Sequence, residues 1–378
     1  MCTINLTTLL SKNNFTIMAY KIPQLPLPLD LETKAIMKKT AAARSALAEM
    51  KGAALSIPNE SILISTLSLQ EAKDSSAIEN IITTHDELYQ GDYLKREFKS
   101  IASKEVHNYA EALRWGFETV RQKGMLTNNH IIQMQATLEE NDAGFRKVPG
   151  TELKNDQTGA VVYTPPQNHD EVVAFMSNLE QFINHKSLSD WDPLVKMAII
   201  HHQFESIHPF YDGNGRTGRI INILYLVKEG LLNLPILYLS RYINQNKADY
   251  YRLLQKVRTE NAWEEWVLYI LDGVEQTSLQ TIKIIEGIKN LMLKHKKKIR
   301  ENTKFYSQDL INNLFKHPYT KIDFIMTDLE VSRLTATKYL DELDQIGIVQ
   351  KVKLGRDNYY INTDLYNLLS NVNQLKHV

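Results

Sequence analysis

The sequence has little cysteine, no excess charge of either sign and no long apolar run. Its single cysteine, Cys2, cannot form an internal disulfide, which excludes a disulfide-stabilised secreted scaffold. The 44 basic and 44 acidic residues give zero net charge, so the whole chain lacks the basic character of a nucleic-acid-binding protein. No apolar stretch approaches the ~20 residues of a membrane-spanning helix, and Lys12 interrupts the apolar residues near the start. We therefore expect a cytoplasmic protein of two to three domains without membrane contact.

The densest chemistry lies between His208 and Arg219, a stretch that reads His-Pro-Phe-Tyr-Asp-Gly-Asn-Gly-Arg-Thr-Gly-Arg. Apolar residues recur at helical spacing on both sides of it, and Pro209 removes a backbone donor just after the first helical segment. We therefore expect His208 to lie where one helix ends, and Asn214 or Gly215 to begin the next helix.

The start of this second helix is predicted to hold an anion. The first-turn amides of a helix have no intrahelical acceptors, and the helix dipole adds partial positive charge there. Gly213 and Gly215 let the backbone approach phosphate oxygens, while Arg216 and Arg219 share one face of the helix. Asp212, just before the turn, suits Mg²⁺, which binds through one carboxylate together with substrate phosphates. The pattern indicates a phosphate site with a magnesium ion.

Other interpretations of this stretch are weaker. Residues 213–218 spell the Gly-x-Gly-x-x-Gly pattern of a dinucleotide-binding turn, but that turn follows a strand, and a helix is expected here. A protein-kinase glycine loop would need partner motifs that the sequence lacks. A purely structural turn leaves His208 and Asp212 without a role. The neighbouring His201 and His202 are expected to pack on the helix, because no cysteine or spaced carboxylate completes a zinc site.

The stretch resembles the signature of the Fic family, His-x-Phe-x-(Asp or Glu)-Gly-Asn-Gly-Arg-x-x-Arg, and every specified position is matched. The resemblance covers about residues 20–290 and implies a mainly α fold, a Fic-type helical bundle, that transfers the AMP part of ATP to a protein hydroxyl. It implies that His208 is the general base and that Asp212 is the Mg²⁺ ligand. The nucleotide-binding residues that it implies are Gly213, Asn214, Gly215, Arg216, Thr217, Gly218 and Arg219. Arg216 would grip the phosphates, and Arg219 would bind the terminal phosphate.

A second feature lies in a helix predicted over about residues 67–88, where Ser75 precedes Glu79 and Asn80. Ser75 and Glu79 share a helix face, and Asn80 is a residue that often ends helices. A carboxylate near a helix C-terminus is unfavourable without a compensating cation, so Glu79 calls for an arginine partner. The segment resembles the inhibitory motif of Fic proteins, (Ser or Thr)-x-x-x-Glu-(Gly or Asn). That resemblance implies that Glu79 pairs with Arg219 and denies it to the γ-phosphate. The alternative is a solvated glutamate on a surface helix.

Two further regions bear on the site. Glycines and prolines punctuate residues 146–166, and 160–164 is the best strand candidate, so a β-hairpin is expected at about 150–165. It resembles the Fic flap, which docks an extended target segment by strand addition; an ordinary connecting hairpin is the alternative. Tyr251 is the candidate for the nucleoside pocket, with a core tyrosine as the alternative. The helical stretches at 104–121 and 129–138 show no chemistry of their own.

We expect the chain to divide into five parts. They are a disordered tail at 1–19 with Met18 as the suspected true start, an N-terminal helical region at 20–100, the Fic core at 101–290, a basic linker at 291–306 and a winged-helix (α+β) domain at 307–378. The last part shows two helical segments, the second capped by Ser332, and two strands around Gly355. Because acidic residues outnumber basic ones on its second helix, protein contact or homodimer formation is favoured over DNA binding.

The expected function is that of an autoinhibited protein adenylyltransferase that uses ATP and Mg²⁺ and is restrained by Glu79. Two alternatives stay open: a regulatory DNA- or protein-binding module in which the Fic site senses a nucleotide, and removal of AMP by the same site. Another nucleotide or a phosphocholine donor also stays open, because relatives vary. Labelling of a protein hydroxyl from ATP would distinguish the enzyme from the sensor.

Overall fold

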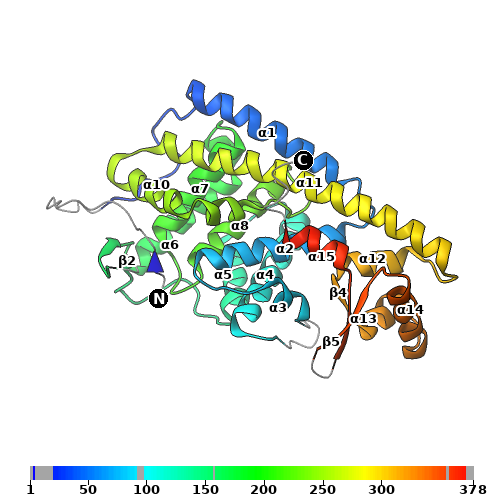
Figure 1. Ribbon diagram of the computed structural model, residues 1–378. Helices are drawn as coiled ribbons and strands as arrows, with labels where there is room; N and C mark the ends of the chain where they lie inside the picture. Colours follow the sequence, from blue (N-terminus) through cyan, green and yellow to red (C-terminus); the bar gives the residue numbers. More distant parts are fainter. Residues whose placement is uncertain (1–2, 5–19, 92–97, 156–157, 355–356, 372–378) are drawn as a thin grey trace.

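The computed structural model describes residues 3–4, 20–91, 98–155, 158–354 and 357–371, and its fold is mainly α, as predicted (Figure 1). The N-terminal helices are α1 (Lys34–Ala54), α2 (Glu60–Ile78), α3 (His85–Gln90), α4 (Ile101–Lys123) and α5 (Asn128–Glu139). The central helices are α6 (His169–Asn184), a 3₁₀ turn (Lys186–Leu188), α7 (Pro193–Ile207), α8 (Asn214–Lys228), α9 (Leu239–Gln245), α10 (Lys247–Glu260) and α11 (Trp263–Asn302). None of the described helices combines the length and apolar character needed to cross a membrane.

Helices α7 and α8 form the centre of the core. Every residue of α7 after Pro193 and every residue of α8 from Asn214 to Leu226 is buried, as expected of helices enclosed on all sides. Helix α7 ends at His208, whose φ of +49° is left-handed, and Gly213, with a φ of +74°, precedes α8. Both helix boundaries predicted around this turn are therefore confirmed. The turn is held between two buried helices, which fixes its position.

Helices α2, α4 and α5 pack around α8, while α1 lies along α11 (Figure 1). Helix α4 approaches α5 and α8 closely at Gly116, where a Cβ atom would collide with Leu224 and Met134. This packing brings the C-terminal ends of α2 and α5 and one side of α4 to the first turn of α8.

The helix predicted over 67–88 is two helices. Helix α2 ends at Ile78, Glu79 caps it, and Asn80 takes a left-handed φ of +64°. Helix α3 then begins after a capping box formed by Thr84 and Glu87. The break is local, since the left-handed residue that ends α2 prevents the helix from continuing.

The predicted hairpin is present as strands β2 (Leu153–Asn155) and β3 (Val161–Tyr163), which pair antiparallel. Strand β1 (Thr3–Ile4) pairs in parallel with the other edge of β2. The tail predicted as disordered at 1–19 thus contains a strand, because β2 offers it free backbone groups. The other tail residues, including Met18, lie outside the described residues.

The C-terminal elements are α12 (Gln308–Lys316), β4 (Tyr319–Thr320), α13 (Ile322–Leu329), α14 (Arg333–Gln345), β5 (Gln350–Leu354), β6 (Asp357–Ile361) and α15 (Thr363–Ser370). The strands form an antiparallel sheet in the order β4-β6-β5, and the two helices and two strands predicted here are present as α13, α14, β5 and β6. Their assignment to a winged helix stays a prediction. Gly355, at the turn of the β5–β6 hairpin, lies outside the described residues.

The basic stretch expected as a linker at 291–306 is mostly helical. Helix α11 continues to Asn302, and its buried residues Met292, His295 and Ile299 keep helical spacing into the C-terminal domain. These side chains pack against α12 and α15, so this part of the chain stays helical although its other faces carry lysines. Only residues 303–307 separate α11 from α12.

Candidate active site

The first turn of α8 is the predicted anion site, and a carboxylate occupies it. Glu79, which follows the last residue of α2, lies over Gly215, where a Cβ atom would collide with the Glu79 carboxylate oxygen Oε1. The unpaired amides and the dipole of α8 favour a negative group at this position. Glu79 therefore stands where the phosphate oxygens of a nucleotide were predicted to bind.

Arg219 holds this glutamate in place. Its Nη2 donates to Glu79 Oε1 at 2.6 Å, and its Nε donates to the Ser75 hydroxyl at 2.7 Å. Burial acts most strongly and lowers the pKa of Arg219, but the Glu79 carboxylate and the weaker effects of Tyr250, Tyr109 and Glu205 together raise it above its ordinary value. The solvated alternative for Glu79 is wrong, because its side chain is only 13% exposed and is paired. Ser75, Glu79 and Arg219 come together as the resemblance implied.

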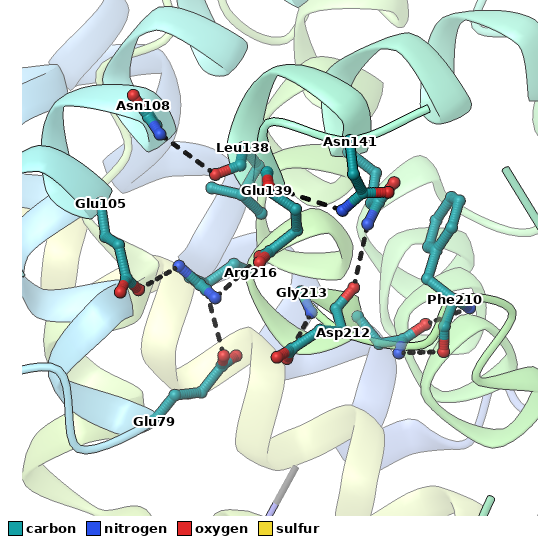
Figure 2. A network of polar contacts seen from close by, with 12 residues as sticks. Glu79, Glu105, Asn108, Leu138, Glu139, Asn141, Phe210, Asp212, Gly213 and Arg216 are labelled. Carbon is teal, nitrogen blue, oxygen red and sulfur yellow. Dashed lines mark hydrogen bonds and ion pairs between the residues drawn. The ribbon is translucent and has the colours of Figure 1, made fainter. Parts of the chain in front are cut away.

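Arg216 is surrounded by three carboxylates from three helix regions, as Figure 2 shows. Its Nε donates to Glu79 Oε2 at 3.1 Å, its Nη1 to Glu105 of α4 at 3.0 Å, and its Nη2 to Glu139 of α5 at 2.8 Å. The guanidinium is 4% exposed, so each of these ion pairs is poorly screened by solvent. Every edge of the guanidinium that could grip a phosphate is therefore taken by a carboxylate.

Glu139 also reaches the glycine turn itself. A Cβ atom on Gly213 would collide with Glu139 Oε1, so two carboxylates cover the two glycines of the cradle. Burial raises the pKa of Glu139 to about 7; Arg216 opposes the rise, and the charges of Asp212, Glu79 and Glu105 add to it. The excess of negative charge at this turn disfavours further anions.

His208 lies beside this turn as a neutral imidazole. Its side chain is buried, and neither ring nitrogen makes a hydrogen bond of normal geometry with the described residues. Burial and, after it, the positive charges of Arg146 and Arg258 together lower the pKa of His208 to about 3. A neutral imidazole with an unused nitrogen can accept a proton from a hydroxyl group.

The remaining signature residues divide between shaping the turn and packing it. The Asn214 amide accepts from Phe210 N at 2.8 Å and donates to Phe210 O at 2.9 Å, which closes the loop (Figure 2). Thr217 is fully buried. Gly218 faces α7, where Glu205 and Phe204 would meet a Cβ atom, so it permits close packing of α7 and α8.

Tyr251, His201 and His202 lie in the core. The ring of Tyr251 packs edge-on against Tyr250 at 5.1 Å, as in the core alternative, and its contact with a nucleoside stays a prediction. His201 bonds to the Tyr250 hydroxyl at 2.9 Å, and His202 contacts the Leu254 carbonyl at 3.2 Å. Both histidines are fully buried, so the packing role predicted for them is confirmed.

Three residues of the site were missed from the sequence. Glu105 lies in the stretch 104–121 and Glu139 directly follows the stretch 129–138, both expected to carry no chemistry, and Arg146 lies in the loop before the hairpin. The signal that singled out Glu79, a carboxylate at the C-terminal end of a helix, is also present at Glu139, the last residue of α5. Glu105 and Arg146 show no such local signal.

The residues around Asp212 are compatible with Mg²⁺ bound together with a nucleotide. Asp212 lies at the entrance of the glycine turn, where its Oδ1 accepts from Gly213 N at 2.8 Å. Within the described residues, no group of three or more histidine, cysteine or acidic side chains forms a ready metal site. A magnesium ion at Asp212 would thus take its other oxygens from phosphates and water, which is its usual mode of binding.

Three domain families match this chain. The Fic/DOC family matches residues 125–226, its N-terminal domain matches 37–118, and the C-terminal domain of "Protein adenylyltransferase SoFic-like" matches 291–365. A curated relative, "Protein adenylyltransferase Fic" of Drosophila erecta, is 29% identical over 130 residues, which are 34% of this chain and 25% of the relative. The matched part thus spans about a quarter of the length of that relative.

Two solved structures share the fold. A Fic family protein from Desulfovibrio desulfuricans superimposes with a TM-score of 0.56 at 20% identity, over 87% of this chain and 96% of its own. A Fic domain containing signaling protein from Bacteroides thetaiotaomicron gives a TM-score of 0.50 at 19% identity, over 68% of this chain and 97% of its own. With the complete signature at His208–Arg219 and the three domain matches, these likenesses lead to one conclusion: the chain belongs to the Fic/DOC family.

Proposed function

We propose that the protein is an autoinhibited adenylyltransferase that transfers AMP from ATP to a hydroxyl group of a protein. The observation that carries the proposal is the Glu79 carboxylate, held at 2.6 Å from Arg219 and 3.1 Å from Arg216 over the first turn of α8. A carboxylate bound there by two arginines indicates a site built for anionic oxygens. The similarity to relatives named protein adenylyltransferases favours adenylyl transfer as the reaction.

In the released state, the first-turn amides of α8, Arg216 and Arg219 would hold the triphosphate. Asp212 would hold Mg²⁺, whose contribution is to neutralise phosphate charge and to orient the leaving group. The target hydroxyl oxygen forms a bond to the α-phosphorus, and the bond from that phosphorus to the oxygen bridging the β-phosphate breaks, so that diphosphate leaves. His208 takes the hydroxyl proton; the negative charge of the bound phosphates would raise its pKa toward the range of an effective base.

The described state cannot hold ATP in this way. Glu79 takes Arg219 away from the γ-phosphate and covers Gly215, so a triphosphate could not present its α-phosphate in line with the attacking hydroxyl. The flap supports docking of an extended target segment, since β2 already accepts a parallel strand, β1, on its outer edge.

The test is intact-mass spectrometry of the full chain after incubation with ATP and Mg²⁺. Glu79→Gly should acquire an AMP adduct at a rate one to a few orders of magnitude above the unmodified protein, since each ~1.4 kcal/mol returned to the transition state is tenfold. The double variant with His208→Ala should acquire none.

The controls separate the enzyme from its alternatives. Arg219→Ala should not mimic Glu79→Gly, because it removes a phosphate contact together with the anchor of the inhibitor. Binding of ATP to Glu79→Gly without any adduct, on itself or on proteins of a cell lysate, would favour the nucleotide sensor. Loss of AMP from a modified protein in place of gain would favour the reverse reaction.

A further inference from the structure

Arg146 is a buried cation joined to the peptide groups around His208. Its Nε donates to the His208 carbonyl at 2.8 Å, and its Nη2 donates to the Ile207 carbonyl at 3.3 Å. Its own backbone N–H donates to the Pro209 carbonyl at 2.8 Å. Arg146 therefore binds three consecutive carbonyls at the end of α7.

These carbonyls have no helical partners of their own. The last carbonyls of a helix lack intrahelical donors, and the left-handed His208, with a φ of +49°, turns the chain away from the helix axis. A guanidinium with several donors in one plane can satisfy such a set, whereas an ammonium group cannot match its geometry. Arg146 thereby fixes the backbone from which the imidazole projects.

The same guanidinium reaches the flap. Nη2 of Arg146 also donates to the carbonyl of Pro166, just after β3, and the Arg146 carbonyl accepts from His169 at 2.9 Å. The residue is 1% exposed, and its hydrogen bonds from the side chain go to carbonyls rather than to a carboxylate. Among the described residues, no ion pair neutralises its positive charge, which acts on the adjacent imidazole.

We infer that Arg146 is a positioning residue of the transfer reaction: it holds His208 and the end of the flap in one arrangement and places its buried guanidinium charge beside the imidazole. This inference rests on the proposed function. The charged groups acting on His208 are Arg146 from the loop before the flap and Arg258 from α10, whose guanidinium lies 3.9 Å from the Tyr163 ring centre; the other polar neighbour is the backbone of Glu205 in α7.

Two substitutions separate charge from geometry, each made in the full chain with Glu79→Gly as the parent. Arg146→Gln removes the charge but not the burial, so the His208 ring should titrate at a higher pH than in the parent. The kcat of Arg146→Gln divided by that of the parent should then fall as the pH is lowered from about 8 to about 6; the ratio cancels titrations common to both proteins. Arg146→Lys keeps the charge but loses the planar fork, so its kcat should be about tenfold lower at every pH, with an unchanged Kd for ATP.

The ring titrations are read by nuclear magnetic resonance, with His208→Ala identifying the signal. The matched control is Lys196→Met, which removes a buried cation from the same α7 at the far end from His208 and should lower Tm without moving the His208 titration. The inference would be overturned if Arg146→Gln had a lower Tm but the same His208 titration as the parent and a kcat ratio that does not change with pH. It would also be overturned if Arg146→Lys had the same kcat as the parent. If Arg146→Gln does not fold, the Arg146→Lys result decides alone. An inactive Glu79→Gly parent would instead refute the proposed function.

Discussion

Several carboxylates compete for the guanidinium of Arg216. Four carboxylates, those of Glu79, Glu105, Glu139 and Asp212, act on its guanidinium, and three of them bond to it directly. Loss of Glu79 frees Arg219 but leaves Arg216 bound to the carboxylates of α4 and α5. A phosphate would then still have to displace charged partners from a side chain that is 4% exposed.

Glu139→Gln should therefore tighten ATP binding when added to Glu79→Gly. At about pH 8 we expect a Kd about tenfold lower, the equivalent of ~1.4 kcal/mol, because one negative charge leaves the phosphate site. At about pH 6 the effect should be smaller, since burial, the main cause of the raised pKa of Glu139, still favours its protonation after Glu79 is removed. Calorimetric titration with ATP at both pH values measures the difference.

The neighbouring Glu140 provides the matched control. It is exposed and forms an ion pair with Lys104, whereas the ion pairs of Arg216 are with Glu79, Glu105 and Glu139, so Glu140→Gln should leave the Kd unchanged. Weaker ATP binding by Glu139→Gln would mean that the carboxylate orients Arg216 for the phosphates rather than competing with them.

The helices around α8 depend on close approach at few positions. Gly116 of α4 has the side chains of Leu224 and Met134 where its Cβ would be, so this crossing sets how far the Glu105 end of α4 lies from Arg216. Gly52, in the exposed last turns of α1, has nothing within 4 Å of its Cβ position.

Substitution of these two glycines should change the free energy of unfolding in opposite directions. Gly116→Val should lower the free energy of unfolding by about 1–3 kcal/mol, because the added carbons force the three helices apart. Gly52→Ala should raise it by about 0.5–1 kcal/mol, because alanine loses less backbone entropy in a helix. Urea unfolding of the full chain measures both, and a Gly116→Val protein as stable as the parent would contradict the packing described.

The C-terminal domain is hydrogen-bonded to α3, the helix that follows Glu79. The Tyr359 hydroxyl donates to the carbonyl of Gln90 at 3.1 Å, and the Tyr319 hydroxyl bonds to Asp86 of α3. On the other side, the 40-residue helix α11 runs from the Fic core into the same domain (Figure 1). The C-terminal domain is therefore joined to the Fic core in two places, by hydrogen bonds to α3 and by the continuous helix α11.

The charges of this domain argue against DNA binding. Arg333 pairs with Asp323 at 3.0 Å and Lys351 with Asp341 at 2.7 Å, so basic side chains on and beside α14 are already neutralised. We expect the full chain to bind duplex DNA no better than non-specifically, with a Kd weaker than about 10⁻⁶ M at physiological salt. Fluorescence anisotropy with a pool of random duplexes measures this, and a tight complex with one selected sequence would reverse the expectation.

Much of the site follows from short-range features of the sequence. The helix end at His208, the helix start at Asn214 and the placing of Arg216 and Arg219 on one face depend on neighbouring residues, helical spacing and one proline, and the structure has them as predicted. The hairpin at β2–β3 and the elements α13, α14, β5 and β6 are likewise local patterns of strand, turn and helix.

The partners of the arginines depend instead on contacts between distant parts of the chain. Glu79, Glu105 and Glu139 are separated from Arg216 by 137, 111 and 77 residues, and they meet only because α2, α4 and α5 pack around α8. A helix pattern states which face is buried but not which neighbour covers it, so the pairing of Glu79 with Arg219 came from a family resemblance and the roles of Glu105, Glu139 and Arg146 were not visible. The continuation of α11 through the lysine-rich stretch has the same cause, since the C-terminal domain covers its apolar face and a charge pattern alone does not distinguish a solvated helix from a linker.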